Sequence, residues 1–257
     1  MCLSFFKKNP EHYLLKYLLT QSPHLQLKHK KMSQHISCLI YDMDGLLLDT
    51  EGIYTEVTQQ IVSEYGKVFD WSVKEKIIGR RAIQAAEIIV ESLGLPITPQ
   101  DYLDTRKDVL LEKFQNTTAL PGAKAITTHF YKQGIPQALA TSSSSPMFDA
   151  KFKKHKKWFS QFAQIVRGDD PELEEGKPAP DIFLLAAKRM GVSPSECLVF
   201  EDAPSGTEAA LAAGMPVVVV PNPNMDHSRY KDASQIISSL KDFDPEYWGL
   251  PGFTEAI

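Results

Sequence analysis

The chain has 257 residues, a length that allows one large domain or one domain with a sizeable insertion. Its formal net charge of −4 argues against nucleic-acid polymers and anionic membranes as partners, and its apolar runs are too short to span a membrane. Three widely spaced cysteines argue against a disulfide scaffold or structural zinc site and favour a reducing compartment.

Residues 1–32 differ from the rest of the chain in charge, because they contain six lysines and one acidic residue. This acid-poor segment has an apolar stretch around Tyr13–Leu19, which is compatible with an organelle-targeting peptide, but it lacks the Arg that such peptides favour. The alternative is a disordered tail, or an upstream start with Met32 as the usual beginning. We predict a disordered basic extension on a cytoplasmic protein, with organelle targeting through residues 1–32 as the alternative.

From Ile36 onward, short apolar runs alternate with amphipathic stretches, which is typical of an α/β fold. Near-continuous apolar runs suit a parallel sheet that is covered on both faces. We therefore predict a doubly wound, Rossmann-like core with a parallel sheet. Its expected strands are Ser37–Tyr41, Pro136–Ala140, Gln164–Val166, Cys197–Phe200 and Pro216–Val220.

The segment between the first two expected strands is far longer than the dozen or so residues that a crossover needs. Within it, Tyr54–Tyr65, Ala82–Leu93 and Pro99–Phe114 show helical spacing of apolar residues. We predict that residues 52–117 form an inserted helical subdomain. Residues 33–51 and 118–257 would then form the core.

Two acidic residues, Asp42 and Asp44, directly follow the first strand, at the edge where doubly wound sheets bind ligands. A carboxylate there can bind Mg2+ or act as a nucleophile, and the second can move a proton. The alternative is a solvated turn that merely ends the strand. After the second strand, a hydroxyl and the N–H groups of the Ser-rich stretch from Thr141 would point at the same edge, where they could hold phosphate oxygens.

Two later segments add charged groups to this edge. The Pro-rich sequence around Lys177 is typical of the start of a helix, but this interpretation does not explain the Lys itself. Its ammonium could offset the negative charge of a transferred phosphoryl group. Glu201 and Asp202 follow another strand and could simply cap the next helix. With Asp42 and Asp44, however, they make four acids at one edge, which repel one another unless a cation such as Mg2+ binds.

The order of these motifs resembles the haloacid dehalogenase superfamily of phosphotransferases, over about Ile36–Phe253. The first motif is Asp42-x-Asp44, the second Thr141, the third Lys177 and the fourth Glu201-Asp202. The resemblance implies that Asp42 is the nucleophile and Asp44 the acid and base, and that the insertion is a helical cap. It also implies that Thr141, Ser142 and Lys177 bind phosphate and that Mg2+ is held by Asp42, Asp44, Glu201 and Asp202, Asp44 through its backbone carbonyl.

Finer matches at residues 42–51, 166–172, 200–206 and 248–251 are similar to eukaryotic pseudouridine-5′-phosphatases and plant glycerol-phosphate phosphatases. This resemblance implies hydrolysis of a small phosphomonoester, with pseudouridine 5′-phosphate as our predicted substrate and glycerol phosphate or a sugar phosphate as the alternatives. Glu51, Arg80 and Arg81 are candidate substrate contacts from the cap, although an Arg on a helix face is more often solvated.

Two other activities are compatible with part of the pattern. A β-phosphoglucomutase-like isomerase would use the same four motifs, and no residue decides between it and a hydrolase. A catalytically inactive binding protein is disfavoured, because all four motifs are intact. The sequence does not indicate protein partners or an oligomeric state.

Overall fold

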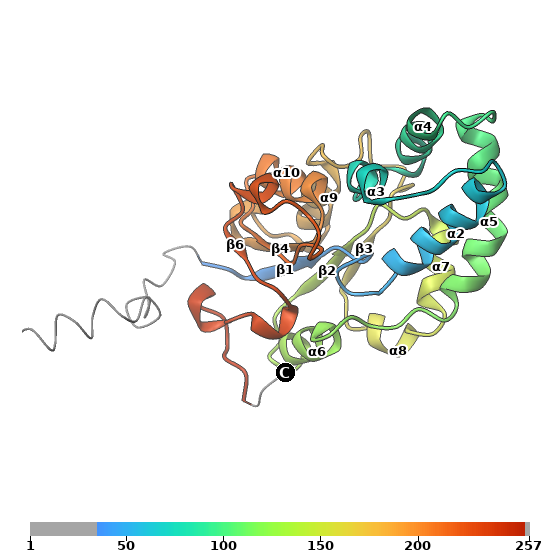
Figure 1. Cartoon of the computed structure of the whole chain (residues 1–257). Helices are drawn as coiled ribbons and strands as arrows, with labels where there is room; N and C mark the ends of the chain where they lie inside the picture. The colour runs from blue at the N-terminus through green and yellow to red at the C-terminus, as the bar shows by residue number, and fades with distance from the viewer. Residues whose placement is uncertain (1–34, 255–257) are drawn as a thin grey trace, which may run out of the picture.

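The computed structural model describes residues 35–254, so the predicted basic extension, residues 1–32, lies outside the described residues. Six parallel strands in this part of the chain form one sheet in the order β3-β2-β1-β4-β5-β6. Their bounds are β1 Cys38–Tyr41, β2 Gln137–Ala140, β3 Gln164–Val166, β4 Cys197–Glu201, β5 Val217–Val219 and β6 Gln235–Ile236. The predicted α/β core with a doubly wound parallel sheet is confirmed (Figure 1).

The strand order places a topological switch between β1 and β4. From β1 the chain continues to β2 and β3 on one side, whereas from β4 it continues to β5 and β6 on the other. In open α/β sheets, ligands bind beyond the carboxyl ends of the strands at such a switch. The first and fourth predicted motifs follow these two neighbouring strands, so the topology brings them together.

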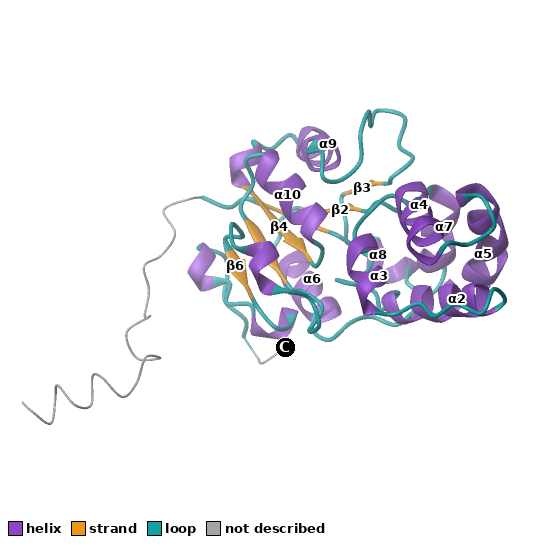
Figure 2. Cartoon of the chain, turned by 45° about the horizontal axis from the view of Figure 1, so that its top comes forward, coloured by secondary structure: helices purple, strands orange, loops and turns teal. Residues whose placement is uncertain are grey.

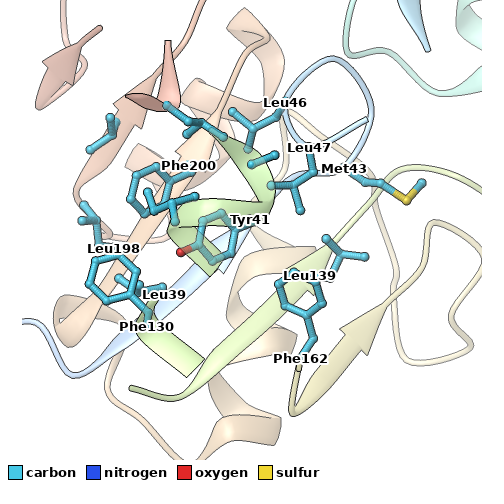
Figure 3. Close-up of a cluster of buried hydrophobic side chains, with 14 of the residues drawn as sticks. Leu39, Tyr41, Met43, Leu46, Leu47, Phe130, Leu139, Phe162, Leu198 and Phe200 are labelled. Carbon is cyan, nitrogen blue, oxygen red and sulfur yellow. The ribbon is translucent and has the colours of Figure 1, made fainter. Parts of the chain in front are cut away.

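Both faces of the sheet are covered, which explains why its strands are apolar throughout. The side chains of β1 alternate between two hydrophobic clusters: Leu39 and Tyr41 belong to the first, and Cys38 and Ile40 belong to the second. Figure 3 shows the first cluster, in which the Tyr41 ring stacks on Phe200 with centroids 4.8 Å apart. The first cluster takes residues from α6 Ala123–Lys132, α7 Ser145–Phe152 and α8 Lys156–Phe159, and the second from α9 Asp181–Met190 and α10 Pro204–Ala212. Figure 2 shows α10 beside β4.

Four helices lie between β1 and α6 and pack beside the sheet, on the side of β3 (Figure 1). Buried residues from all four, including Val57, Val73, Ile89 and Leu110, form a third hydrophobic cluster of their own. The chain leaves and re-enters the core at adjacent points, because the Asp49 N–H donates to the Thr118 carbonyl at 2.9 Å. The bounds are α2 Glu51–Ser63, α3 Trp71–Ile77, α4 Ala82–Leu93 and α5 Pro99–Phe114.

Some elements were not predicted. Helix α3 has only seven residues and β6 only two, so neither gives a clear periodic signal.

Cys38 and Cys197, far apart in sequence, are direct partners on β1 and β4, where both are buried and form no disulfide. Among the described residues, no helix has the length and apolar character needed to cross a membrane.

Candidate active site

Asp42 immediately follows β1, and the chain then makes a tight turn over residues 43–48. The N–H of Leu47 donates to the Met43 carbonyl at 3.0 Å, and the N–H of Gly45 donates to the Leu48 carbonyl at 3.0 Å. Gly45 has a φ of +84°, and a Cβ at this position would overlap the carboxylate of Asp202. Glycine is therefore required here both for the turn and for the approach of the fourth motif to the first.

The carboxyl edge of the sheet and the helical insertion enclose a cavity of about 710 Å3. Residues from both parts of the chain line it. Thr141 is the one predicted site residue that does not; it is fully buried behind the cavity wall. The predicted site residues that line the cavity are Asp42, Asp44, Glu51, Arg80, Arg81, Ser142, Lys177, Glu201 and Asp202.

A buried ammonium group, that of Lys177, joins the first and fourth motifs. Its Nζ lies 2.5 Å from Asp42 Oδ1 and 2.6 Å from Glu201 Oε1. Burial alone would lower the pKa of Lys177, but attraction to the two carboxylates raises it above its ordinary value, so the group stays charged. Glu201 Oε2 accepts hydrogen bonds from the N–H groups of Asp202 and Ala203, at 2.9 and 3.1 Å.

Asp42 and Asp202 form a pair of buried, mutually repelling carboxyl groups. Burial raises the pKa of Asp42 to about 7, with repulsion from Glu201 and Asp44 adding to the effect of burial against the attraction of Lys177. Burial also raises the pKa of Asp202, together with repulsion from Glu201 and Asp42. A cation between these oxygens would favour their ionised forms, so the donor set fits a hard cation such as Mg2+.

Three of the four acids are paired with buried lysines: Asp42 and Glu201 with Lys177, and Asp44 with Lys151. In the described residues, no group of three or more His, Cys, Asp or Glu side chains forms a ready-made metal cluster. The metal-binding roles predicted for Asp42, Asp44, Glu201 and Asp202 stay predictions.

Asp44 is held on both carboxylate oxygens. Oδ1 forms an ion pair with Lys151, and Oδ2 accepts hydrogen bonds from Ser143 Oγ at 2.8 Å and Thr141 Oγ1 at 3.3 Å. Burial would raise the pKa of Asp44, but the Lys151 ammonium brings it below its ordinary value. The Thr141 hydroxyl thus supports Asp44, and the predicted role of Thr141 in phosphate binding stays a prediction.

The insertion contributes the opposite wall of the cavity. Glu51 lies 3.3 Å from Lys74 Nζ, and burial raises the pKa of Glu51 despite this partner. The side chain of Arg81 lies directly over Gly176, where any Cβ would overlap the guanidinium. This contact brings the basic segment of the insertion to the loop that carries Lys177. Arg80 also lines the cavity, and its Nε donates to the Lys76 carbonyl at 3.0 Å.

No role was predicted from the sequence for Tyr54, Lys74 and Ser143, which line the cavity, or for Lys151, which pairs with Asp44. Ser143 belongs to the Ser-rich stretch that was singled out, so its position carried a signal. Lys151 opens a strongly basic run that extends to Lys157, and such a run is typical of a solvated surface. No pattern in the sequence distinguishes the buried lysine from its exposed neighbours.

Comparison with known proteins points to one family. The family model for haloacid dehalogenase-like hydrolases matches residues 36–214. The chain is 46% identical over 226 residues to "(DL)-glycerol-3-phosphatase 1, mitochondrial" of Arabidopsis thaliana, covering 86% of this chain and 76% of that protein. It is 42% identical over 228 residues to a "Probable pseudouridine-5′-phosphatase" of Drosophila melanogaster, covering 88% of this chain and 99% of the other.

Solved structures share the fold. The crystal structure of CbbY from Rhodobacter sphaeroides in complex with xylulose-(1,5)bisphosphate has a TM-score of 0.70 to this chain at 21% identity. The match covers 80% of this chain and 96% of CbbY. The similarity therefore extends over the sheet and the helical insertion together.

Proposed function

The chain belongs to the haloacid dehalogenase-like hydrolases and is a phosphatase, and on this premise we propose that it hydrolyses a small phosphomonoester through an aspartyl-phosphate on Asp42, with Mg2+ as cofactor. One observation carries the proposal. At the switch between β1 and β4, the Asp42 carboxylate lies 2.5 Å from the Lys177 ammonium, at the wall of a cavity closed by the insertion. A nucleophile and a charge-neutralising cation therefore meet where a phosphate can enter.

The residues then have defined roles in two half-reactions. A carboxylate oxygen of Asp42 attacks phosphorus and the bond from phosphorus to the leaving oxygen breaks. Asp44, which must enter this step in its protonated form although Lys151 favours the ionised one, gives the leaving oxygen its proton. In the second step, water attacks the aspartyl-phosphate and gives its proton to Asp44. Inorganic phosphate leaves and Asp42 is regenerated. Lys177 and the N–H groups after Thr141 hold the phosphoryl oxygens in both steps.

Mg2+ would be held by the carboxylates of Asp42 and Asp202 and the backbone carbonyl of Asp44, with Glu201 as the remaining predicted ligand. When bound, it offsets the negative charge that two buried acids and a phosphate bring together. We propose that residues 52–117 act as a cap, because Gly79 and Arg81 of this segment contact the core beside the site. Closure of this cap would exclude water while the substrate is bound.

Removal of the metal should abolish turnover. We expect EDTA to lower phosphate release by at least about 100-fold, because the repulsion among the site's carboxylates is then uncompensated. Excess Mg2+ should restore the activity, whereas Ca2+ should restore it poorly, because Ca2+ prefers more ligands at longer distances. The measurement is phosphate release after dialysis against EDTA and re-addition of each ion. Full activity in EDTA would contradict the metal assignment.

The size of the cavity bears on the substrate. A volume of about 710 Å3 lies well within the range of sites for drug-sized ligands and exceeds what glycerol phosphate needs. The wall includes the aromatic residues Tyr54 and Phe69 and the basic residues Arg80 and Arg81, so it offers aromatic surface as well as hydrogen-bond donors. We therefore propose a nucleoside-sized substrate, pseudouridine 5′-phosphate. The 46% identity to the Arabidopsis glycerol-3-phosphatase favours glycerol 3-phosphate as the second candidate.

Relative kcat/KM values separate these candidates. We expect pseudouridine 5′-phosphate to exceed glycerol 3-phosphate by at least about 10-fold, since a site that hydrogen-bonds a base discriminates against ligands without one. Uridine 5′-phosphate and a sugar phosphate complete the panel. A 10-fold lead for glycerol 3-phosphate would replace the substrate and leave the catalytic assignments intact. Isomerisation of a sugar phosphate without accumulation of inorganic phosphate would favour the mutase alternative.

The cytoplasm is the proposed location. The word "mitochondrial" in the name of the Arabidopsis relative supports the alternative, in which residues 1–32 direct this chain to an organelle.

A further inference from the structure

Lys151, on the last turn of α7, is a fully buried lysine with oxygen partners from both parts of the chain. Its Nζ forms an ion pair with Asp44 Oδ1 and a hydrogen bond of 2.8 Å to Ser143 Oγ, both in the core. It also donates to the hydroxyl of Tyr54, on α2 of the insertion, at 3.2 Å. The ammonium therefore lies at the junction between the insertion and the core.

Two aromatic rings of the insertion complete its surroundings. Lys151 Nζ lies 4.3 Å from the ring centroid of Phe114 and 5.2 Å from that of Tyr54. The two rings pack edge to face, with their centroids 5.1 Å apart. Because desolvated cation–π contacts are attractive, the rings on helices α2 and α5 help to hold the ammonium in place.

The contacts of Lys151 determine how the Asp44 carboxylate lies. Oδ1 is held by Lys151, while Oδ2 is held by Ser143 and Thr141, so rotation of the carboxylate would break at least one of these interactions. The Ser143 hydroxyl donates a hydrogen bond to Asp44 Oδ2 and accepts one from Lys151 Nζ, so it links the contacts of the two carboxylate oxygens. A buried ion pair is costly to desolvate, and apolar side chains in place of both Lys151 and Asp44 would pack the same space at no greater cost. Stability alone therefore does not account for a charge at this position.

We propose that Lys151 is a positioning residue, which holds the Asp44 carboxylate where it transfers the leaving-group proton and makes that placement depend on the packing of α2 and α5. The inference rests on the proposed function, because it takes Asp44 as the group that moves this proton. It deepens that function by linking the insertion to the proton-transfer step through one side chain.

The test compares two leaving groups in the Lys151→Met variant. An alkyl phosphate needs a proton on its leaving oxygen, whereas p-nitrophenyl phosphate releases a stable anion without one. For the alkyl substrate, we expect kcat/KM to fall by about 100-fold, the scale of positioned proton transfer, with KM nearly unchanged. For p-nitrophenyl phosphate, kcat/KM should fall less than about 5-fold, since no proton is required.

Two comparisons test whether the loss of activity in Lys151→Met arises from Asp44. Asp44→Asn should give the same dependence on the leaving group, and adding Lys151→Met to Asp44→Asn should cause no further loss. The matched control is Lys153→Met, because Lys153 also joins α7 to the insertion, through a 3.0 Å hydrogen bond to Gln115, but is exposed and does not contact Asp44. This control should leave both substrates unaffected.

A second variant covers the case in which Lys151→Met does not fold. Phe114→Leu removes only one aromatic face from the ammonium, and Phe114 does not line the cavity. It should lower kcat/KM about 5-fold for the alkyl substrate and hardly at all for p-nitrophenyl phosphate. Equal losses on both substrates, in either variant, would overturn the proposal in favour of a purely structural role. Absence of phosphate release by the wild-type protein would instead refute the proposed function.

Discussion

Asp42→Asn should eliminate phosphate release while the protein stays folded. An amide is a far weaker nucleophile than a carboxylate, and it cannot form the aspartyl-phosphate on which both half-reactions depend. We expect kcat to fall by on the order of 10⁴-fold or more, as is typical when an enzyme loses its covalent nucleophile. The measurement is phosphate release with the best substrate of the panel, at saturating Mg2+.

The fold of this variant should be preserved, because Asn has the shape of Asp and Lys177 retains Glu201 as a partner at 2.6 Å. Asp49→Asn is the matched control: Asp49 lies in the same segment after β1, but its side chain is exposed and does not line the main cavity. That variant should keep full activity. Substantial turnover by Asp42→Asn with an intact circular-dichroism spectrum would refute the covalent mechanism.

The sheet could be predicted because its strands are buried on both faces. Leu39 and Tyr41 face one cluster and Ile40 the other, so the run has no polar interruption and is visible as a short apolar segment. The acids after these runs then mark the carboxyl edge. Helix α3 and strand β6 lack such a signal, since a few residues cannot show a period and their placement depends on contacts with distant segments.

The candidate site could be predicted only as far as residue type and strand position specify it. These showed that Asp42, Asp44, Glu201 and Asp202 would gather at one edge, and the structure places all four at one cavity. Residue type and strand position could not show which lysine side chain pairs with which acid. Asp44 and Lys151 lie 107 residues apart in the chain, so their pairing depends on how α7 packs beside the end of β1. Because lysine side chains are rarely fully buried, the residue type alone predicts that Lys151 is exposed to solvent.

Lys177→Met should have a large effect on both stability and catalysis. Lys177 is buried and lies between two carboxylates, so a neutral side chain would leave Asp42 and Glu201 facing one another without a cation. Removal of one member of a buried ion pair costs about 3–5 kcal/mol, a large share of the total stability of an ordinary domain. We also expect kcat/KM to fall by on the order of 10³-fold, because the charge of the transferred phosphoryl group is no longer offset.

The stability loss of Lys177→Met should depend on cations and on Asp42. Urea unfolding should show a larger gain from added Mg2+ in Lys177→Met than in the wild type, because a cation bound to Asp42 and Asp202 replaces part of the missing charge. Combining Lys177→Met with Asp42→Asn should recover part of the lost stability, since one buried carboxylate is then removed as well. Lys188→Met, at an exposed lysine paired with Glu172, should leave the unfolding midpoint nearly unchanged. If Lys177→Met were as stable as this control, with or without Mg2+, the buried charges at the β1–β4 edge would not be coupled as the structure indicates.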